Sequence, residues 1–169
     1  MKITNCTPKD LGAIQELYTA ARNLQTERAM VVWPAFDNDF LENEIAEKRQ
    51  WKIVSNGIIV CNWAVSYSDK AIWGEKDKEN SVFIHRICTH PSYRGNRYID
   101  AIITWAKAHA VQQGRQYVRL DTLGNNQKLI RHYTTAGFIF LGMVMLTDTH
   151  QLPLHYQQEP HCCLFEIMV

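Results

Sequence analysis

The stretch that decides the fold is ICTHPSYRGNRYI, residues 87–99. Apolar residues of strand type precede a Pro-containing loop, and helical spacing follows it, so a strand, a loop and a helix start are predicted in that order. A loop at a helix N-terminus presents unpaired backbone N–H groups and the positive end of the helix dipole, which suits a phosphate or pyrophosphate. Arg94 and Arg97 add positive charge. A solvated surface turn is the alternative interpretation, because a loop with one glycine is a weak signal.

Strand and helix patterns alternate on both sides of this stretch. Strands are predicted at 3–6, 51–54, 58–65, 81–89, 117–121, 138–146 and 162–169. Helices are predicted from Thr7-Pro8 through Ala21, at 35–49, from Ile99 to near Gly114, and at 126–136. Asn56-Gly57 predicts a hairpin turn, and the polar run 75–80 predicts a surface loop. This order favours a mixed α/β sheet.

Length and composition limit the classes of protein. The chain has 169 residues, which fits one domain over 1–169. Eighteen Lys and Arg against seventeen Asp and Glu give a net charge of +1, which argues against a general nucleic-acid binder. No segment has the apolar length of a membrane span. The five cysteines, of which Cys162 and Cys163 are adjacent, predict a reducing compartment, and we expect the cytoplasm.

A second motif, NQKLIRHYTTAGF at residues 126–138, stands about thirty residues after the first. Asn126, Tyr133 seven positions later, and the Gly-Phe pair at 137–138, downstream of a Pro-x-x-Arg-Gly loop, resemble the GNAT superfamily of acetyl-coenzyme A dependent N-acetyltransferases. The predicted order of elements agrees with that superfamily over essentially the whole chain. The resemblance implies an α/β (α+β) acyl-CoA N-acyltransferase fold, with a central mixed, mostly antiparallel sheet of about seven strands flanked by about four helices.

The resemblance also implies acetyl-CoA as co-substrate. In the family the loop reads Arg-Gly-x-Gly-x-Gly/Ala, and its backbone N–H groups hold the pyrophosphate. Arg97 and Ile99 stand here where the second glycine and the third small residue are expected. The alternatives are that each replacement obstructs the cofactor, that it forces another backbone path, or that Arg97 compensates by its charge. The cofactor-binding residues implied by the resemblance are Ile87, Cys88, Thr89, Arg94, Gly95, Asn96, Arg97, Tyr98, Ile99, Asn126 and Tyr133.

Catalytic roles follow from the same resemblance. Tyr133 matches the family's general acid, and a phenol with an ordinary pKa near ~10 stays protonated at neutral pH, as that role requires. His85 is the first candidate for the base, because strand alternation places it on one face with Ile87 and Thr89 and because histidine suits proton removal at neutral pH. A structural, hydrogen-bonded histidine is the alternative. Asp121 is the second candidate, with a turn or capping carboxylate as its alternative.

The leading hypothesis is an enzyme that transfers an acetyl group from acetyl-CoA to a primary amine of a small molecule or peptide, by direct attack through a tetrahedral intermediate. A non-catalytic acyl-CoA binding or sensing module is the alternative, and a scaffold without coenzyme A is a third. No metal site is expected, because the spacing of the late His and Cys residues matches no common zinc arrangement. Dimers are common in the family and the final strand offers apolar surface, so a homodimer is one alternative for the oligomeric state. The acceptor amine is not determined by the sequence.

Overall fold

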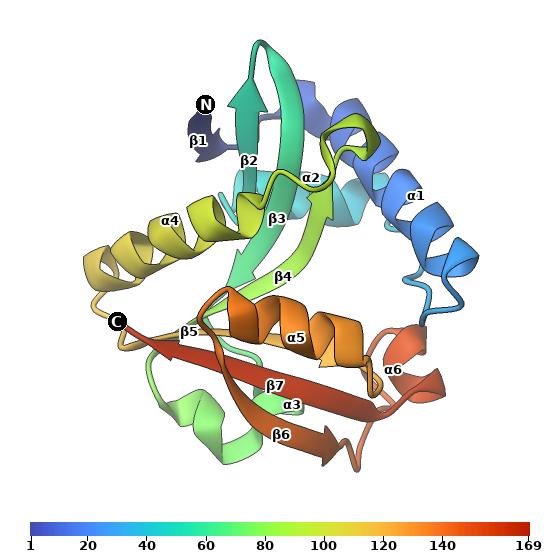
Figure 1. Cartoon of the computed structure of the whole chain (residues 1–169), viewed down its shortest axis with the longest axis vertical. Coiled ribbons are helices and arrows are strands. Elements are labelled where there is room, and N and C mark those ends of the chain that lie inside the picture. The colour runs from blue at the N-terminus through green and yellow to red at the C-terminus, as the bar shows by residue number, and fades with distance from the viewer. The chain divides into compact units, whose positions relative to one another are not determined.

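A computed structural model describes residues 1–169. Its strands are β1 (Lys2–Asn5), β2 (Gln50–Ser55), β3 (Ile58–Ser66), β4 (Ser81–Thr89), β5 (Tyr117–Leu123), β6 (Ile139–Met145) and β7 (His161–Met168). Its helices are α1 (Leu11–Glu27), α2 (Asn38–Ala46), α3 (Lys70–Trp73), α4 (Tyr98–Gln112), α5 (Gln127–Thr135) and α6 (Leu154–Gln158). Short 3-10 turns are η1 (Pro8–Asp10), η2 (Gly74–Lys78) and η3 (Pro91–Tyr93). The helix and strand labels are those of Figure 1.

The strands form one mixed sheet in the order β1-β2-β3-β4-β5-β7-β6. The pairs β1–β2, β2–β3, β5–β7 and β6–β7 are antiparallel, and β4 pairs with β5 in parallel. The predicted fold class is therefore confirmed, since the four longer helices are those expected and α3 and α6 are short additions. The run 75–80, expected as a loop, lies largely in η2.

The chain divides into two compact units. The first unit comprises Met1–Val65 and His85–Tyr98, and the second comprises Ser66–Ile84 and Ile99–Val169. Strand β4 supplies residues to both units, because the division falls between Ile84 and His85. No helix has both the length and the apolar character needed to cross a membrane.

The first unit is built on a hairpin and two helices. Asn56 and Gly57 have φ angles of 51° and 77°, so the β2–β3 turn uses the left-handed conformations that the Asn-Gly pair tolerates. Helix α1 buries Ile14, Leu17 and Tyr18, whose spacing places them on one face. They form a core with four further buried residues, from the segment after β1, from α2 and from β4: Cys6, Leu41, Ile45 and Cys88.

The second unit places β7 between β5 and β6. Most of β7 is buried, and only Met168 is exposed. The expectation of apolar surface on the final strand is therefore wrong, because pairing on both sides covers it. The exposed apolar strand is β6, where six of seven residues are exposed. In Figure 1, β6 has β7 on one side and no strand on its other side.

All five cysteines are buried and free of disulfides. Burial raises the pKa of the Cys6 and Cys61 thiols to about 12 each. It also raises the pKa of the Cys88, Cys162 and Cys163 thiols above the ordinary value. Each side chain thus packs as a small apolar residue with its proton retained.

Candidate functional site

The loop from His90 to Arg97 leaves β4 and leads directly into α4. The Nδ1 atom of His90 accepts a hydrogen bond from the Ser92 N–H at 3.3 Å, which starts the turn η3. The side-chain amide of Asn96 donates a hydrogen bond to the Tyr93 carbonyl at 2.8 Å, which links the two ends of the segment 93–96. Arg94 donates to the Ala20 carbonyl of α1 at 3.2 Å, so this arginine ties the loop to the first helix.

The backbone of this loop turns through left-handed conformations twice. Gly95 has a φ angle of +89°, and Arg97 has a φ angle of +50°. The left-handed conformation costs a residue with a side chain roughly 1–2 kcal/mol, which is why glycine is usual there. Arg97 thus adopts the conformation for which glycine is favoured, at the position where the family loop is expected to carry its second glycine. Arg94, Gly95, Asn96 and Arg97 are all exposed.

The other predicted binding residues of this stretch differ in exposure. Cys88 is buried in the core of the first unit, and Ile99 is buried in α4. Ile87, Thr89 and Tyr98 are half-buried. The hydroxyl of Thr89 lies 3.7 Å from the Cys61 sulfur, on the neighbouring strand β3. The Cys88 and Ile99 side chains therefore serve packing, and a ligand contact at these two positions must come from the backbone.

His85 lies on β4 in the first unit and is half-buried. Burial, together with the positive charges of Arg86 and Arg49, lowers the pKa of His85 to about 3. At neutral pH the imidazole is therefore uncharged and can accept a proton. Its weak basicity gives a small driving force for removing a proton from an amine.

A buried ionic network beside His85 was missed by sequence reasoning. Glu44 of α2 is 2% exposed and accepts hydrogen bonds from Arg86 at 2.5 Å and 2.6 Å and from Arg49 at 2.8 Å. The Arg86 guanidinium also lies 5.1 Å from the ring centres of Phe36 and Phe40. Arg86 has a φ angle of +52° inside β4, so the strand departs there from extended geometry. Glu44 and Arg86 are 42 residues apart in the sequence, so their pairing leaves no local sequence signal.

Tyr133 and Asn126 belong to α5 and its cap in the second unit. The Asn126 side-chain oxygen accepts hydrogen bonds from the Lys128 and Leu129 N–H groups, so Asn126 is the N-cap of α5. The Tyr133 ring is half-buried, with Phe165 at 5.3 Å and Phe138 at 5.9 Å between ring centres. The Gly-Phe pair of the motif thus supports the tyrosine, since Phe138 lies edge-on to its ring.

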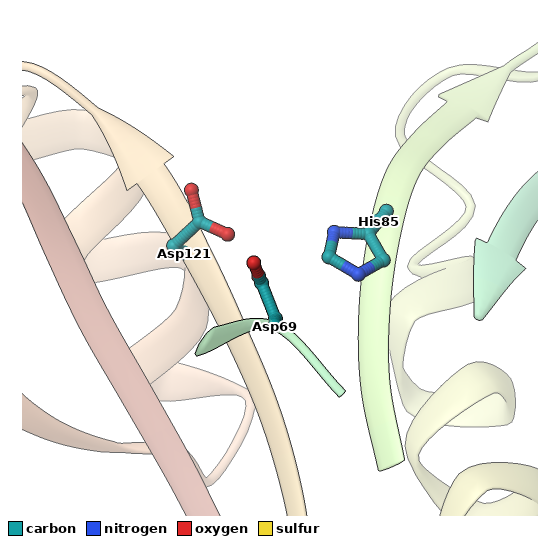
Figure 2. A group of neighbouring side chains, drawn as sticks. All are labelled: Asp69, His85 and Asp121. Atoms are coloured by element: carbon teal, nitrogen blue, oxygen red, sulfur yellow. The ribbon is translucent and has the colours of Figure 1, made fainter. Parts of the chain in front are cut away.

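Two carboxyl groups meet inside the second unit. Asp121 lies on β5 and Asp69 lies just before α3, and their oxygens are within 4.8 Å of one another. Figure 2 shows both, and it also labels His85 of the first unit. The Tyr156 hydroxyl donates to Asp121 Oδ2 at 3.1 Å. Sequence reasoning named Asp121 but missed Asp69 and Tyr156, which lie in segments without a recognisable motif.

Both aspartates hold their protons more tightly than ordinary carboxyl groups. Burial raises the pKa of Asp121 to about 6. Burial and the neighbouring charge of Asp121 raise the pKa of Asp69 to about 8. The pair therefore loses one proton near pH 6, and burial together with repulsion retains the second to about pH 8. Asp121 is consequently a carboxylate with unusual basicity, inside β5 rather than at a strand end or cap.

The same pair makes folding stability depend on pH. The folded-state pKa values lie above the unfolded values near ~3.9, so the native state binds more protons and stability falls as pH rises from about 4 to about 8. Asp69→Asn removes one of the two charges. We expect this variant to be more stable than the wild type at pH 8, by on the order of 2 kcal/mol, and to lose most of that advantage at pH 4. Urea unfolding at both pH values measures the difference.

The control for this experiment is Asp39→Asn in α2, which changes an exposed carboxylate outside the pair. It should leave the shape of the stability–pH curve unchanged. If Asp69→Asn and Asp39→Asn gave parallel curves, the proposed coupling of Asp69 to Asp121 would be refuted.

Comparison with known proteins gives the family. The model of the acetyltransferase (GNAT) family matches residues 18–138, which include parts of both units. The uncharacterized N-acetyltransferase YesJ of Bacillus subtilis is 25% identical over 79 residues, covering 47% of this chain and 44% of that protein. The matched segment thus spans less than half of this relative.

Solved structures agree with the fold. A GNAT-family acetyltransferase from Listeria monocytogenes matches with a TM-score of 0.78 at 17% identity, over 99% of this chain and 94% of that one. The structure of yncA from Salmonella typhimurium, which includes its cofactor acetyl-CoA, matches with a TM-score of 0.68 at 16% identity, over 99% and 92% of the two chains. At these identities the likeness concerns the fold alone. With the family model matching most of its length, the chain belongs to the GNAT family of acetyltransferases.

Proposed function

We propose that this protein transfers an acetyl group from acetyl-CoA to a primary amine of a small molecule or peptide. The observation that carries the proposal is the left-handed backbone at Gly95 and Arg97, immediately before α4. Arg97 keeps this conformation at a steric cost, and a strained backbone retained at a loop is a reason to look for function there. Family membership and the relative that contains acetyl-CoA support the same co-substrate.

The loop would bind the pyrophosphate through its backbone. The N–H groups at the start of α4 have no partners within the helix, and the helix dipole favours negative charge there. The Arg97 guanidinium would add a charge-assisted hydrogen bond to a phosphate oxygen. Four consecutive loop residues, 94–97, are exposed, so the loop backbone lies at the surface where a ligand can reach it.

In the proposed reaction the amine nitrogen attacks the thioester carbonyl directly. A C–N bond forms, the tetrahedral intermediate collapses, and the C–S bond breaks. Tyr133 would give its phenolic proton to the departing thiolate. The amine proton would pass to a base, for which Asp121 is better suited than His85. With pKa values of about 6 and about 3 respectively, Asp121 is the stronger base while still ionised at neutral pH.

The test of co-substrate binding is the melting temperature with and without excess acetyl-CoA. Ligand at about 100 times its dissociation constant should stabilise the protein by about 2.7 kcal/mol. Arg97→Gly should weaken acetyl-CoA binding about tenfold, because it removes one charge-assisted hydrogen bond. Arg97→Lys keeps the charge, so its affinity for acetyl-CoA should lie between those of the wild type and Arg97→Gly. Tighter binding by Arg97→Gly would show that Arg97 obstructs the ligand.

Release of thiol across a panel of primary amines separates an enzyme from a binding module. Stabilisation by acetyl-CoA without amine-dependent thiol release would favour the non-catalytic alternative. Absence of any stabilisation by acetyl-CoA would refute both the enzyme and the non-catalytic binding module.

A further inference from the structure

The guanidinium of Arg86, on β4 in the first unit, keeps one nitrogen without a hydrogen bond. Nη2 donates to the two carboxylate oxygens of Glu44 at 2.5 Å and 2.6 Å, and Nε donates to the Tyr18 hydroxyl at 3.4 Å. Nη1 has no partner in the chain, and it is not among the polar atoms that are sealed from solvent. With the side chain 18% exposed, the two N–H groups of Nη1 are available to a ligand.

Aromatic rings surround the same guanidinium. Its central carbon lies 5.1 Å from the ring centres of Phe36 and Phe40 and 5.9 Å from that of Tyr18. Phe36 and Phe40 stack on one another at 5.7 Å. Rings exclude water and lower the local dielectric constant, so a charge-assisted hydrogen bond made by Nη1 is stronger than one made at an open surface.

The ionic network around Arg86 has more positive than negative charge at its buried end. Glu44 accepts from both Arg86 and Arg49. The second partner of Arg49 is Glu47, whose side chain is 60% exposed and therefore screened by water. Burial lowers the pKa of His85, and the positive charges of Arg86 and Arg49 lower it further. The single buried carboxylate thus leaves a positive field along β4.

The position of Arg86 in the chain relates this field to the acceptor. A role for Arg86 in acetyl transfer rests on the proposed function, in which residues 87–89 contact acetyl-CoA near the thioester. Arg86 directly precedes that segment. The coenzyme phosphates are assigned to 94–97, eight or more positions further along the chain. An anion bound at Arg86 would therefore belong to the molecule whose amine attacks the thioester.

We propose that the acceptor amine carries a carboxylate, as an amino acid does, and that Arg86 Nη1 binds this carboxylate while Nη2 stays on Glu44. A single carboxylate supplies the one negative charge that the buried network lacks. A phosphate dianion fits less well, because the Glu44 carboxylate on the adjacent nitrogen would repel its second charge. Acceptors with several ammonium groups are disfavoured by the same positive field.

The first test uses the wild type and acceptors that differ only at the carboxylate. Thiol release is measured for free glycine, leucine and phenylalanine, each beside its primary amide. The carboxylate member of a pair should have a kcat/KM about 10-fold to 100-fold higher, the usual value of a charge-assisted hydrogen bond. The amine of the amide is the less protonated of the two at neutral pH, so this difference works against the expected result.

The second test assigns the preference to Arg86. Arg86→Met combined with Glu44→Gln removes the guanidinium without leaving a buried carboxylate unpaired. The preference for the carboxylate should fall to within about threefold, through a higher KM for the acceptor, while KM for acetyl-CoA stays within about twofold. Glu44→Gln alone is the matched control, because it keeps the Arg86 side chain and should keep the preference.

The possible results separate this proposal from acetyl transfer itself. Equal kcat/KM for the amino acids and their amides, or thiol release only with amines that lack a carboxylate, would overturn the proposal and leave acetyl transfer intact. A preference that persists in the double variant would overturn the assignment to Arg86. So would a raised KM for acetyl-CoA with an unchanged preference, since the contact would then be to coenzyme A. Absence of thiol release with every amine would instead contradict the proposed function.

Discussion

Replacing Tyr133 with phenylalanine is expected to lower the turnover of acetyl transfer by about 10²-fold to 10⁴-fold, the usual contribution of a positioned general acid. The substitution removes only the hydroxyl. The ring contacts with Phe138 and Phe165 are those of a hydrophobic side chain and remain available to phenylalanine. Turnover should therefore fall while the melting temperature stays within a few degrees of the wild type. Steady-state thiol release gives the first quantity and thermal melting the second.

Tyr67→Phe is the control for Tyr133→Phe. It also deletes a phenolic hydroxyl in the second unit, where Tyr67 lies 2.9 Å from His109 Nε2 through its hydroxyl. This variant should retain near wild-type turnover. Undiminished turnover in Tyr133→Phe would refute the assignment of Tyr133 as the acid.

The pH profile of the same reaction distinguishes the two base candidates. A base must be deprotonated to act, so kcat/KM should rise with pH through the pKa of Asp121, about 6. Asp121→Asn should abolish this rise and lower the rate. A rise that survives in Asp121→Asn and disappears in His85→Gln would assign the base to His85 instead.

Loss of the Arg119 side chain is expected to destabilise the protein by about 3–5 kcal/mol, the cost of breaking a buried ion pair. Arg119 is fully buried in β5, and it donates to Glu166 at 2.5 Å and 2.8 Å. It also pairs with Glu79 and lies 4.8 Å from the Trp73 ring centre. Arg119→Met removes the positive charge and leaves the Glu166 carboxylate without it. For a chain of this size, the melting temperature should fall by roughly 10 °C.

The control is Arg131→Met, which changes an exposed arginine of α5 in the same unit. Surface substitutions of this kind usually alter stability by less than about 0.5 kcal/mol. Adding Glu166→Gln to Arg119→Met should recover part of the loss, because the uncompensated charge is then gone. Equal melting temperatures for the two arginine variants would show that the buried pair contributes little.

The order of elements could be predicted because its signals are local. Asn56-Gly57 predicts the hairpin by turn chemistry, and the stripe of Ile14, Leu17 and Tyr18 predicts α1 by its period. The exposed strand could not be predicted in the same way. Both β6 and β7 are apolar, and only the pairing of β7 on two sides distinguishes the buried strand from the edge.

The residues of the candidate site likewise fall into those with a local sequence signal and those without one. Arg94, Gly95 and Tyr133 could be named from motifs, whereas Asp69 could not, because it meets Asp121 from 52 positions away along the chain. The presence of Arg97 in place of the family's second loop glycine could be seen in the sequence. The conformation of Arg97 could not, since an arginine gives no indication of a positive φ angle.

The state of the five cysteines determines how the chemistry can be observed. Thiol reagents attack the thiolate, and here every thiol is buried with a raised pKa. A chromogenic disulfide added at pH 8 should therefore develop colour from free coenzyme A with little background from the folded enzyme. Conversely, alkylation of these cysteines by iodoacetamide would count the molecules that have opened, so coenzyme A thiol reports turnover and protein thiol reports unfolding.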